Sequence, residues 1–183
     1  MVNYKLKPYD LTLVALTTAI TCILGPVAFV LPFSPVPVTL GLLGIMLATC
    51  ILGPRLGIIS CLIYLLVGAI GVPVFSGFSG GMGIPLGPGG GYLIGYLWLP
   101  ICCFPFRNSG SSQLGKMLPG LFTGLLLCYL CGTFWLSYQL EISIAQGFLI
   151  GTLPYIPFDI CKLFIAYFLS KSIRKRLTKA GLY

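Results

Sequence analysis

Long apolar stretches, interrupted by short segments rich in glycine, proline or charge, make up most of this 183-residue sequence. A helix needs about 20 mostly apolar residues to cross a bilayer. By that measure the sequence predicts six transmembrane helices, at about residues 10–30, 36–52, 56–72, 91–106, 118–140 and 157–172. Only 8% of the residues are charged, whereas a soluble domain has about 25%. We therefore expect one all-helical membrane domain over residues 1–183, without a separate soluble domain.

The apolar stretch at residues 142–153 is too short to cross a bilayer. It is typical of an interfacial or re-entrant helix that precedes the last span. An alternative joins residues 144–169 into one helix. Pro154 and Pro157 favour a break, because proline lacks an amide hydrogen and restricts the residue before it. Pro157 also suits the first turn of the final helix.

The basic residues are distributed very unevenly. With six spans, the basic residues outside the spans all fall in segments on one side of the membrane: Lys5, Lys7, Arg55, Arg107, Lys116 and the group from Lys171 to Lys179. The opposite segments contain no Lys or Arg, and one acid, Glu141. Because cytoplasmic loops are enriched in Lys and Arg, we expect both termini in the cytoplasm. The C-terminal basic group then lies at lipid headgroups, and no nucleic-acid partner is expected.

Asp159 and Lys162 are the one acid and one base that lie well inside an apolar segment. Residues three apart on a helix project from nearly the same face. A charge at the bilayer centre costs roughly 2.5–3.5 kcal/mol on insertion scales, so a retained charge indicates a functional site. The topology places Asp159 in the first turn of the last span, where the helix N-terminus favours an anion. The alternative is an ion pair that only stabilises the bundle, although apolar residues would serve that purpose equally well.

A segment rich in glycine and proline, residues 71–92, connects the third and fourth predicted spans. The topology puts it outside the cell. Glycine lets backbone approach a ligand closely, and proline limits flexibility. We expect this segment to form a lid that presents backbone N–H and C=O groups to a ligand; the alternative is a flexible connector.

The sequence lacks the residue patterns that several kinds of chemistry require. The sequence has no phosphate-binding loop of the Gly-x-x-x-x-Gly-Lys-Ser/Thr type, so it should not hydrolyse ATP. It contains no histidine, and its eight cysteines lie in or beside apolar runs, as expected for small buried side chains. We expect no metal, no cofactor and no enzymatic activity. The residues alone therefore indicate a bundle that binds a small molecule.

Four segments then carry motifs at a recognisable spacing: Pro35-Val-Pro-Val-Thr39, Gly71-Val-Pro-Val-Phe75, Gly87-Pro-Gly-Gly-Gly-Tyr92 and Pro154-x-x-Pro157-x-Asp159-x-x-Lys162. Together they resemble the BioY family, the biotin-binding substrate subunits (S components) of energy-coupling factor (ECF) transporters. The resemblance extends from Leu11 to Lys171. Two positions depart from the family pattern, since Gly41 stands where the family often has Gln and Gly89 where it often has Thr.

The resemblance implies that biotin is the ligand. Asp159 would accept a hydrogen bond from a ureido N–H, and Lys162 would donate one to the ureido carbonyl. Phe75 and Tyr92 are the expected apolar walls. Backbone N–H groups of the glycine-rich segment, including Gly90 and Gly91, are expected to bind the valeryl carboxylate.

The resemblance also implies partner proteins in a bacterial cytoplasmic membrane. Ala15 and Ala19 match a small-x-x-x-small motif that docks the first helix onto the ECF transmembrane coupling subunit. Two ATPase subunits on other chains would supply the energy to carry biotin inward. A stand-alone secondary carrier for biotin or a related vitamin is the alternative, with Asp159 as a proton site.

Overall fold

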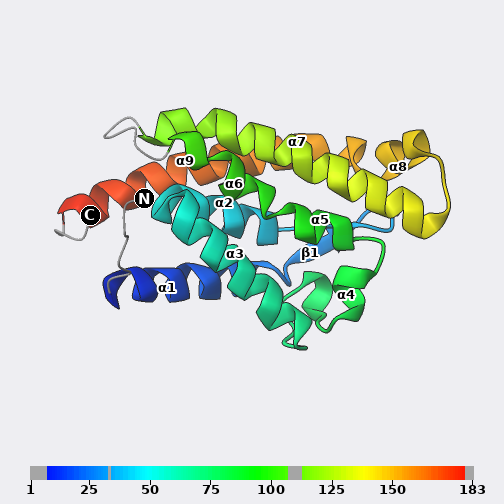
Figure 1. Cartoon of the computed structure of the whole chain (residues 1–183), viewed down its shortest axis with the longest axis horizontal. Helices are drawn as coiled ribbons and strands as arrows, with labels where there is room; N and C mark the ends of the chain where they lie inside the picture. The colour runs from blue at the N-terminus through cyan, green and yellow to red at the C-terminus, as the bar shows by residue number, and fades with distance from the viewer. Residues whose placement is uncertain (1–7, 33, 107–112, 180–183) are drawn as a thin grey trace.

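The computed structural model describes residues 8–32, 34–106 and 113–179, and these are mostly helical (Figure 1). The elements in chain order are α1 (Pro8–Leu24), β1 (Ala28–Val30), β2 (Pro37–Thr39), α2 (Gly41–Leu52), α3 (Pro54–Ala69), η1 (Ser76–Phe78), α4 (Gly83–Leu86), α5 (Gly90–Gly95), α6 (Trp98–Cys102), η2 (Phe104–Phe106), α7 (Gln113–Leu140), α8 (Ile144–Gly151), η4 (Leu153–Tyr155) and α9 (Ile156–Lys179). Helix α2 lies in the middle of the bundle, where it packs against α1, α3 and α9.

The first two predicted spans are both too long, because a short β-hairpin replaces part of each. Helix α1 ends at Leu24, just before Gly25 and Pro26, and α2 begins only at Gly41. Between them β1 and β2 pair antiparallel, with Phe29 opposite Val38. The hairpin was not predicted, since its residues continue the apolar pattern of the flanking helices.

The fourth predicted span, residues 91–106, is broken into α5, α6 and η2. Pro100 explains the first break, because proline cannot donate to the carbonyl four residues earlier and its ring clashes with it. That carbonyl belongs to Tyr96, which instead accepts from the amide of Leu99 at 3.3 Å. The chain therefore turns at Tyr96 and Leu97 rather than continuing as one straight helix.

The predicted break before the last span is confirmed. Helix α8 begins with a capping box, in which the Ser143 side chain and the Gln146 side chain each bond to the other's backbone amide. It ends at Gly151, and α9 starts at Ile156 with Pro157 in its first turn. The final helix runs to Lys179, past the predicted end at residue 172.

Two stretches of the described chain are long and apolar enough to cross a membrane: Leu114–Leu140 and Ile144–Lys179. The apolar helices at Pro8–Leu24, Gly41–Leu52, Pro54–Ala69 and Gly90–Phe106 are shorter. Large apolar side chains are nevertheless exposed along the outer faces of α1, α7 and α9, such as Leu16, Phe134 and Phe168. Exposed apolar surface on several helices is what a bilayer solvates, whereas a count of six complete spans remains a prediction.

The charges divide the bundle into two ends. Figure 1 shows the start of α1, α3 and α7 and the end of α9 at one end, and α4, α8 and the end of α7 at the other. Arg55 is in the first turn of α3, Lys116 is in the first turns of α7, and Lys179 is in the last turn of α9. Glu141 follows α7 at the opposite end. Apart from Lys162 near the start of α9, the described basic residues thus gather as predicted, while Lys5, Lys7 and Arg107 lie outside the described residues.

Candidate ligand-binding site

The buried ion pair predicted from the sequence is present. Lys162 Nζ donates to Asp159 Oδ1 at 2.8 Å, and both residues lie in the first two turns of α9. The two side chains are 8% exposed. Asp159 lies in the first turn of α9, where the partial positive charge of the helix N-terminus attracts an anion. The pair is therefore buried in a position that accommodates both charges.

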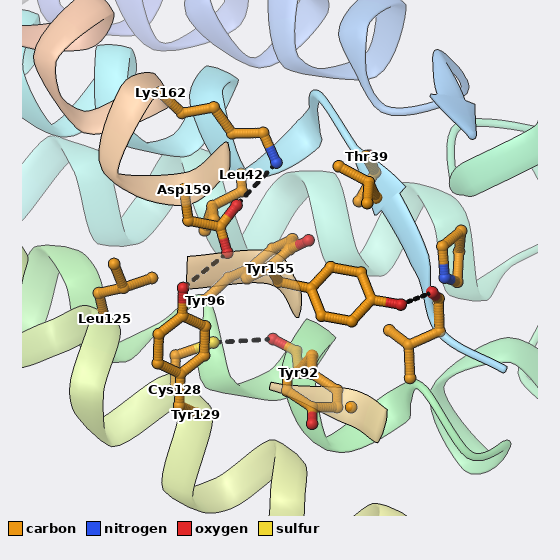
Figure 2. Close-up of a pocket in the computed structure, with 14 residues that line it drawn as sticks. Thr39, Leu42, Tyr92, Tyr96, Leu125, Cys128, Tyr129, Tyr155, Asp159 and Lys162 are labelled. Carbon is orange, nitrogen blue, oxygen red and sulfur yellow. Dashed lines mark hydrogen bonds and ion pairs between the residues drawn. The ribbon is translucent and has the colours of Figure 1, made fainter. Parts of the chain in front are cut away.

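The carboxylate has a second partner from a different helix. Tyr129, on α7, donates its hydroxyl to Asp159 Oδ2 at 2.9 Å. Figure 2 shows Lys162, Asp159 and Tyr129 linked in this order along one side of a pocket. Each oxygen of the carboxylate is thus held by one donor, so the orientation of the group is fixed.

A small cavity of about 40 Å³ lies against this chain of hydrogen bonds. Its walls come from β2, α2, α5, α7, the end of α8 and α9. The lining residues are Val36, Pro37, Val38, Thr39, Leu42, Tyr92, Tyr96, Leu125, Cys128, Tyr129, Gly151, Tyr155, Asp159 and Lys162. An apolar enclosure with a few polar groups is typical of small-molecule sites.

A larger cavity of about 240 Å³ adjoins the first. The two share Val36, Pro37, Thr39, Tyr92 and Tyr96, so they form adjacent parts of one region. The far wall of the larger cavity is the glycine- and proline-rich segment, with Ser76, Ser79, Gly83, Gly87, Pro88 and Gly89. The region therefore extends from the buried ion pair to the segment that we expected to cover a ligand.

The glycine- and proline-rich segment is folded rather than a loose connector. It contains η1 and α4, and Phe75 and Ser79 form an isolated bridge. Side chains of α7 hold it from outside: Trp135 Nε1 donates to the Gly87 carbonyl at 2.9 Å, and Gln139 Nε2 donates to the Leu86 carbonyl at 2.6 Å. This segment is thus fixed to α7.

Hydroxyl groups connect the cavity wall to the break before α9. Tyr92 and Thr152 share a hydrogen bond of 3.1 Å, and Thr133 and Thr152 share one of 2.8 Å. Thr152 is completely buried. The hydroxyl of Tyr155 shares a hydrogen bond of 2.5 Å with the Ser34 hydroxyl and donates to the Val36 carbonyl, which ties the chain between β1 and β2 to η4. These bonds link segments that are far apart in the sequence.

The structure brings together only some of the residues expected at the site. Asp159, Lys162 and Tyr92 line the smaller cavity. Phe75 lines neither cavity; it is fully buried, with its ring packed edge-on to Tyr64 at 5.6 Å between centroids. Gly68 makes room for this ring, since a Cβ there would lie 2.1 Å from it.

Gly90 and Gly91 also line neither cavity. A Cβ on Gly91 would lie 2.3 Å from Cβ of Trp135, and one on Gly90 would lie 1.7 Å from the Pro85 carbonyl oxygen. In this structure these two glycines permit close packing of α5 against α7 and α4. Gly89, one of the two departures from the family pattern, does line the larger cavity.

Several lining residues were missed by the sequence reasoning, above all the tyrosines at 96, 129 and 155. Tyr96 follows Tyr92 by four residues and therefore shares its helix face, which is a signal that could have identified it. Tyr155 lies inside the Pro154-x-x-Pro157 motif, which is a signal for it, whereas nothing in the local sequence of Tyr129 distinguishes it from the remaining tyrosines.

Ala15 and Ala19 lie on the exposed face of α1, whereas Val14, Thr17 and Thr18 are buried on the other face. Small exposed residues four apart allow another helix to approach closely. The alanines are accessible to a partner, and their role in docking remains a prediction.

The fold and the site define a class of protein: a helical membrane bundle that encloses a pocket for a small molecule beside one buried ion pair. Among the described residues, no group of three His, Cys, Asp or Glu side chains could hold a metal ion.

The model of the BioY family matches residues 2–179, and the chain belongs to this family. It is 38% identical to the probable biotin transporter BioY of Pyrococcus horikoshii over 169 residues, which cover 92% of this chain and 98% of the relative. It is 34% identical to the biotin transporter BioY of Lactococcus lactis over 184 residues, covering 95% of this chain and 94% of the relative.

A solved structure shows a similar fold. It is described as the S-component for biotin from an ECF-type ABC transporter, and it aligns with a TM-score of 0.82 and 34% identity. The alignment covers 91% of this chain and 90% of the other. The resemblance recognised in the motifs is thereby confirmed.

Proposed function

We propose that this chain is the S component of an ECF-type biotin transporter: it binds biotin in the membrane and delivers it inward together with partner subunits. The observation that carries this proposal is the buried pair of Asp159 and Lys162 at the wall of a cavity. Membership of the BioY family supports biotin as the ligand.

The ureido ring of biotin suits the smaller cavity. Asp159 uses one acceptor position for Lys162 and one for Tyr129, and a carboxylate offers about four. The ammonium group of Lys162 has three N–H donors, one of which points at Asp159. We infer that Asp159 accepts from a ureido N–H while Lys162 donates to the ureido carbonyl. Such charge-assisted bonds are the strong ones in a dry pocket.

The valeryl chain then extends into the larger cavity. Tyr92 lies on the boundary of both cavities and is the expected apolar wall between the ring and the chain. The carboxylate is assigned to backbone N–H groups of the glycine- and proline-rich segment that forms the far wall, such as that of Gly89, since the Gly87 amide already donates to the Ile84 carbonyl. Phe75, Gly90 and Gly91 belong to the same segment and hold it in place through their packing against α3, α4 and α7 respectively.

The topology of the proposal has six spans and both termini in the cytoplasm. The support is the segregation of the described basic residues other than Lys162 at the end of the bundle where α1 begins and α9 ends, away from α4 and α8 (Figure 1). Biotin would then enter from outside, between the hairpin and the glycine- and proline-rich segment. The exposed alanines of α1 would dock onto the ECF coupling subunit, and two ATPase subunits would drive the transfer.

Equilibrium binding of biotin to the purified protein in nanodiscs tests the proposal. We expect Asp159→Asn and Lys162→Met each to weaken binding by about 1.5–3 kcal/mol, the range for a hydrogen bond to a charged group. Glu141→Gln and Lys116→Met are the matched controls, because both residues are exposed and neither lines either cavity. Desthiobiotin should compete and lipoate, which lacks the ureido ring, should not. Absence of biotin binding would refute the function, and normal binding by both site variants would refute the site.

A further inference from the structure

The Asp159 carboxylate lies where two very different environments meet. On one side is the small cavity with the ion pair. On the other side of the α7 wall is a wide groove of about 800 Å³, lined almost entirely by apolar side chains from α7, α8 and α9, such as Phe122, Phe148 and Ile160. Leu125 and Tyr129 are the two residues that line both. They form the partition between the buried charges and this apolar groove.

Of these two residues, Tyr129 also forms a hydrogen bond to the Asp159 carboxylate. Its ring is part of the apolar groove, and its hydroxyl reaches through to Asp159 Oδ2 at 2.9 Å. The residue is 8% exposed. Without this hydroxyl, Oδ2 would face a phenyl edge and the groove behind it, and a buried acceptor without a donor is costly.

The two bonds to Asp159 have different consequences for its geometry. Lys162 lies on the same helix, three residues on, and its long side chain can follow the carboxylate through several rotamers. Tyr129 lies on α7, has a rigid ring and approaches the other oxygen. The bond from α7 therefore fixes the rotation of the carboxylate about its Cβ–Cγ bond, which the bond from Lys162 alone does not.

We propose that Tyr129 is a positioning residue for ligand recognition: it holds Asp159 so that the remaining acceptor positions of the carboxylate point into the cavity, toward the N–H groups of a cyclic urea. The proposal rests on the proposed function, because it requires Asp159 to accept from the ureido group. Tyr129 acts through Asp159, and its own donor is occupied by that residue.

A double-mutant cycle on biotin affinity tests this role. Tyr129→Phe keeps the ring and removes the hydroxyl, and we expect it to weaken biotin binding about tenfold, as for loss of one hydrogen bond to a charged group. In an Asp159→Asn background the same change should have almost no further effect, because its target has already been altered. Tyr64→Phe is the matched control. It removes a buried hydroxyl bonded to the Val74 carbonyl, so its effect should add to that of Asp159→Asn.

Two further readouts separate positioning from general packing. Tyr129→Met also removes the hydroxyl but replaces the ring by a side chain of different shape. If the hydroxyl donor determines the affinity, this variant should bind biotin as weakly as Tyr129→Phe. Desthiobiotin keeps the ureido ring, so its affinity should fall by the same factor as that of biotin. An unchanged affinity in Tyr129→Phe, or effects of Tyr129→Phe and Asp159→Asn that simply add, would overturn the positioning role. If Asp159→Asn itself binds biotin normally, the proposed site fails instead.

Discussion

The contact between Gly132 and Tyr92 makes a sharp test of how the cavity wall is supported. Gly132 lies on α7, directly behind the ring of Tyr92, which lines both cavities. A Cβ at position 132 would lie 2.2 Å from Cδ1 and 2.5 Å from Cγ of that ring. Ordinary contacts of a Cβ begin at 3.4 Å. The substitution Gly132→Ala therefore requires the ring to withdraw by about 1 Å or more, toward the cavity.

The cost of this movement follows from which atoms collide. Cγ is attached directly to Cβ of Tyr92, so a rotation of the ring alone cannot relieve the contact, and α5 has to move away from α7. Overpacking of this kind typically costs about 1–3 kcal/mol, and we expect the upper part of the range. Replacing glycine by alanine within a helix returns about 0.5–1 kcal/mol. The expected net loss of stability is therefore about 2 kcal/mol.

The ligand-free protein in nanodiscs should show this loss as a lower midpoint of thermal unfolding, and biotin affinity should fall at least tenfold because the shared wall is displaced. Gly115→Ala is the control, since Gly115 is also on α7 and a Cβ there meets nothing within 4 Å. Gly115→Ala should leave the biotin affinity unchanged, and the midpoint of thermal unfolding should stay the same or rise slightly. If Gly132→Ala matches Gly115→Ala in stability and in affinity, the close packing of α5 on α7 does not support the site.

Two further predictions concern the segments that border the cavities. Trp135→Phe removes the donor to the Gly87 carbonyl, at a cost of about 0.5–1.5 kcal/mol for one hydrogen bond; hydrogen exchange of residues 81–90 should become faster, and an unchanged exchange rate would contradict the anchoring role. Tyr155→Phe removes the hydroxyl that ties the chain between the hairpin strands to η4. Biotin should dissociate faster from this variant, measured by displacement with excess unlabelled ligand, whereas an unaltered dissociation rate would show that the tie does not retain the ligand.

The helical segments could be predicted well where the length of the apolar stretch and the positions of the prolines indicated the same helix bounds. Residues 118–140 fall within α7, and Pro157 marked the start of the last helix almost to the residue. The prediction was wrong where apolar residues form something other than a helix. Ala28–Val30 has the hydrophobicity of a span, yet it pairs with β2 because Gly25 and Pro26 end α1 first. Hydrophobicity alone does not distinguish a strand buried in a bundle from the continuation of a helix.

The site could be predicted only in part, for a related reason. Phe75 was expected at the ligand because of its place in a distinctive segment, but its contact with Gly68 and Tyr64 depends on how α3 folds against that segment. Contacts of this type arise between elements and have no local signature. The buried pair of Asp159 and Lys162 could be predicted because its signal is local: two charges one turn apart in an apolar helix.

The cost of burying a residue determines how visible its role is in a membrane sequence. A charge in an apolar span is expensive, so Asp159 and Lys162 mark a site without further information. A tyrosine costs little in the same surroundings, because its ring is apolar and its hydroxyl needs one partner. Tyr129 can therefore hold the carboxylate of Asp159 while resembling any other aromatic residue of α7. In such a chain the sequence reveals the buried charges, and the neutral donors bonded to those charges become visible only when the helices are placed side by side.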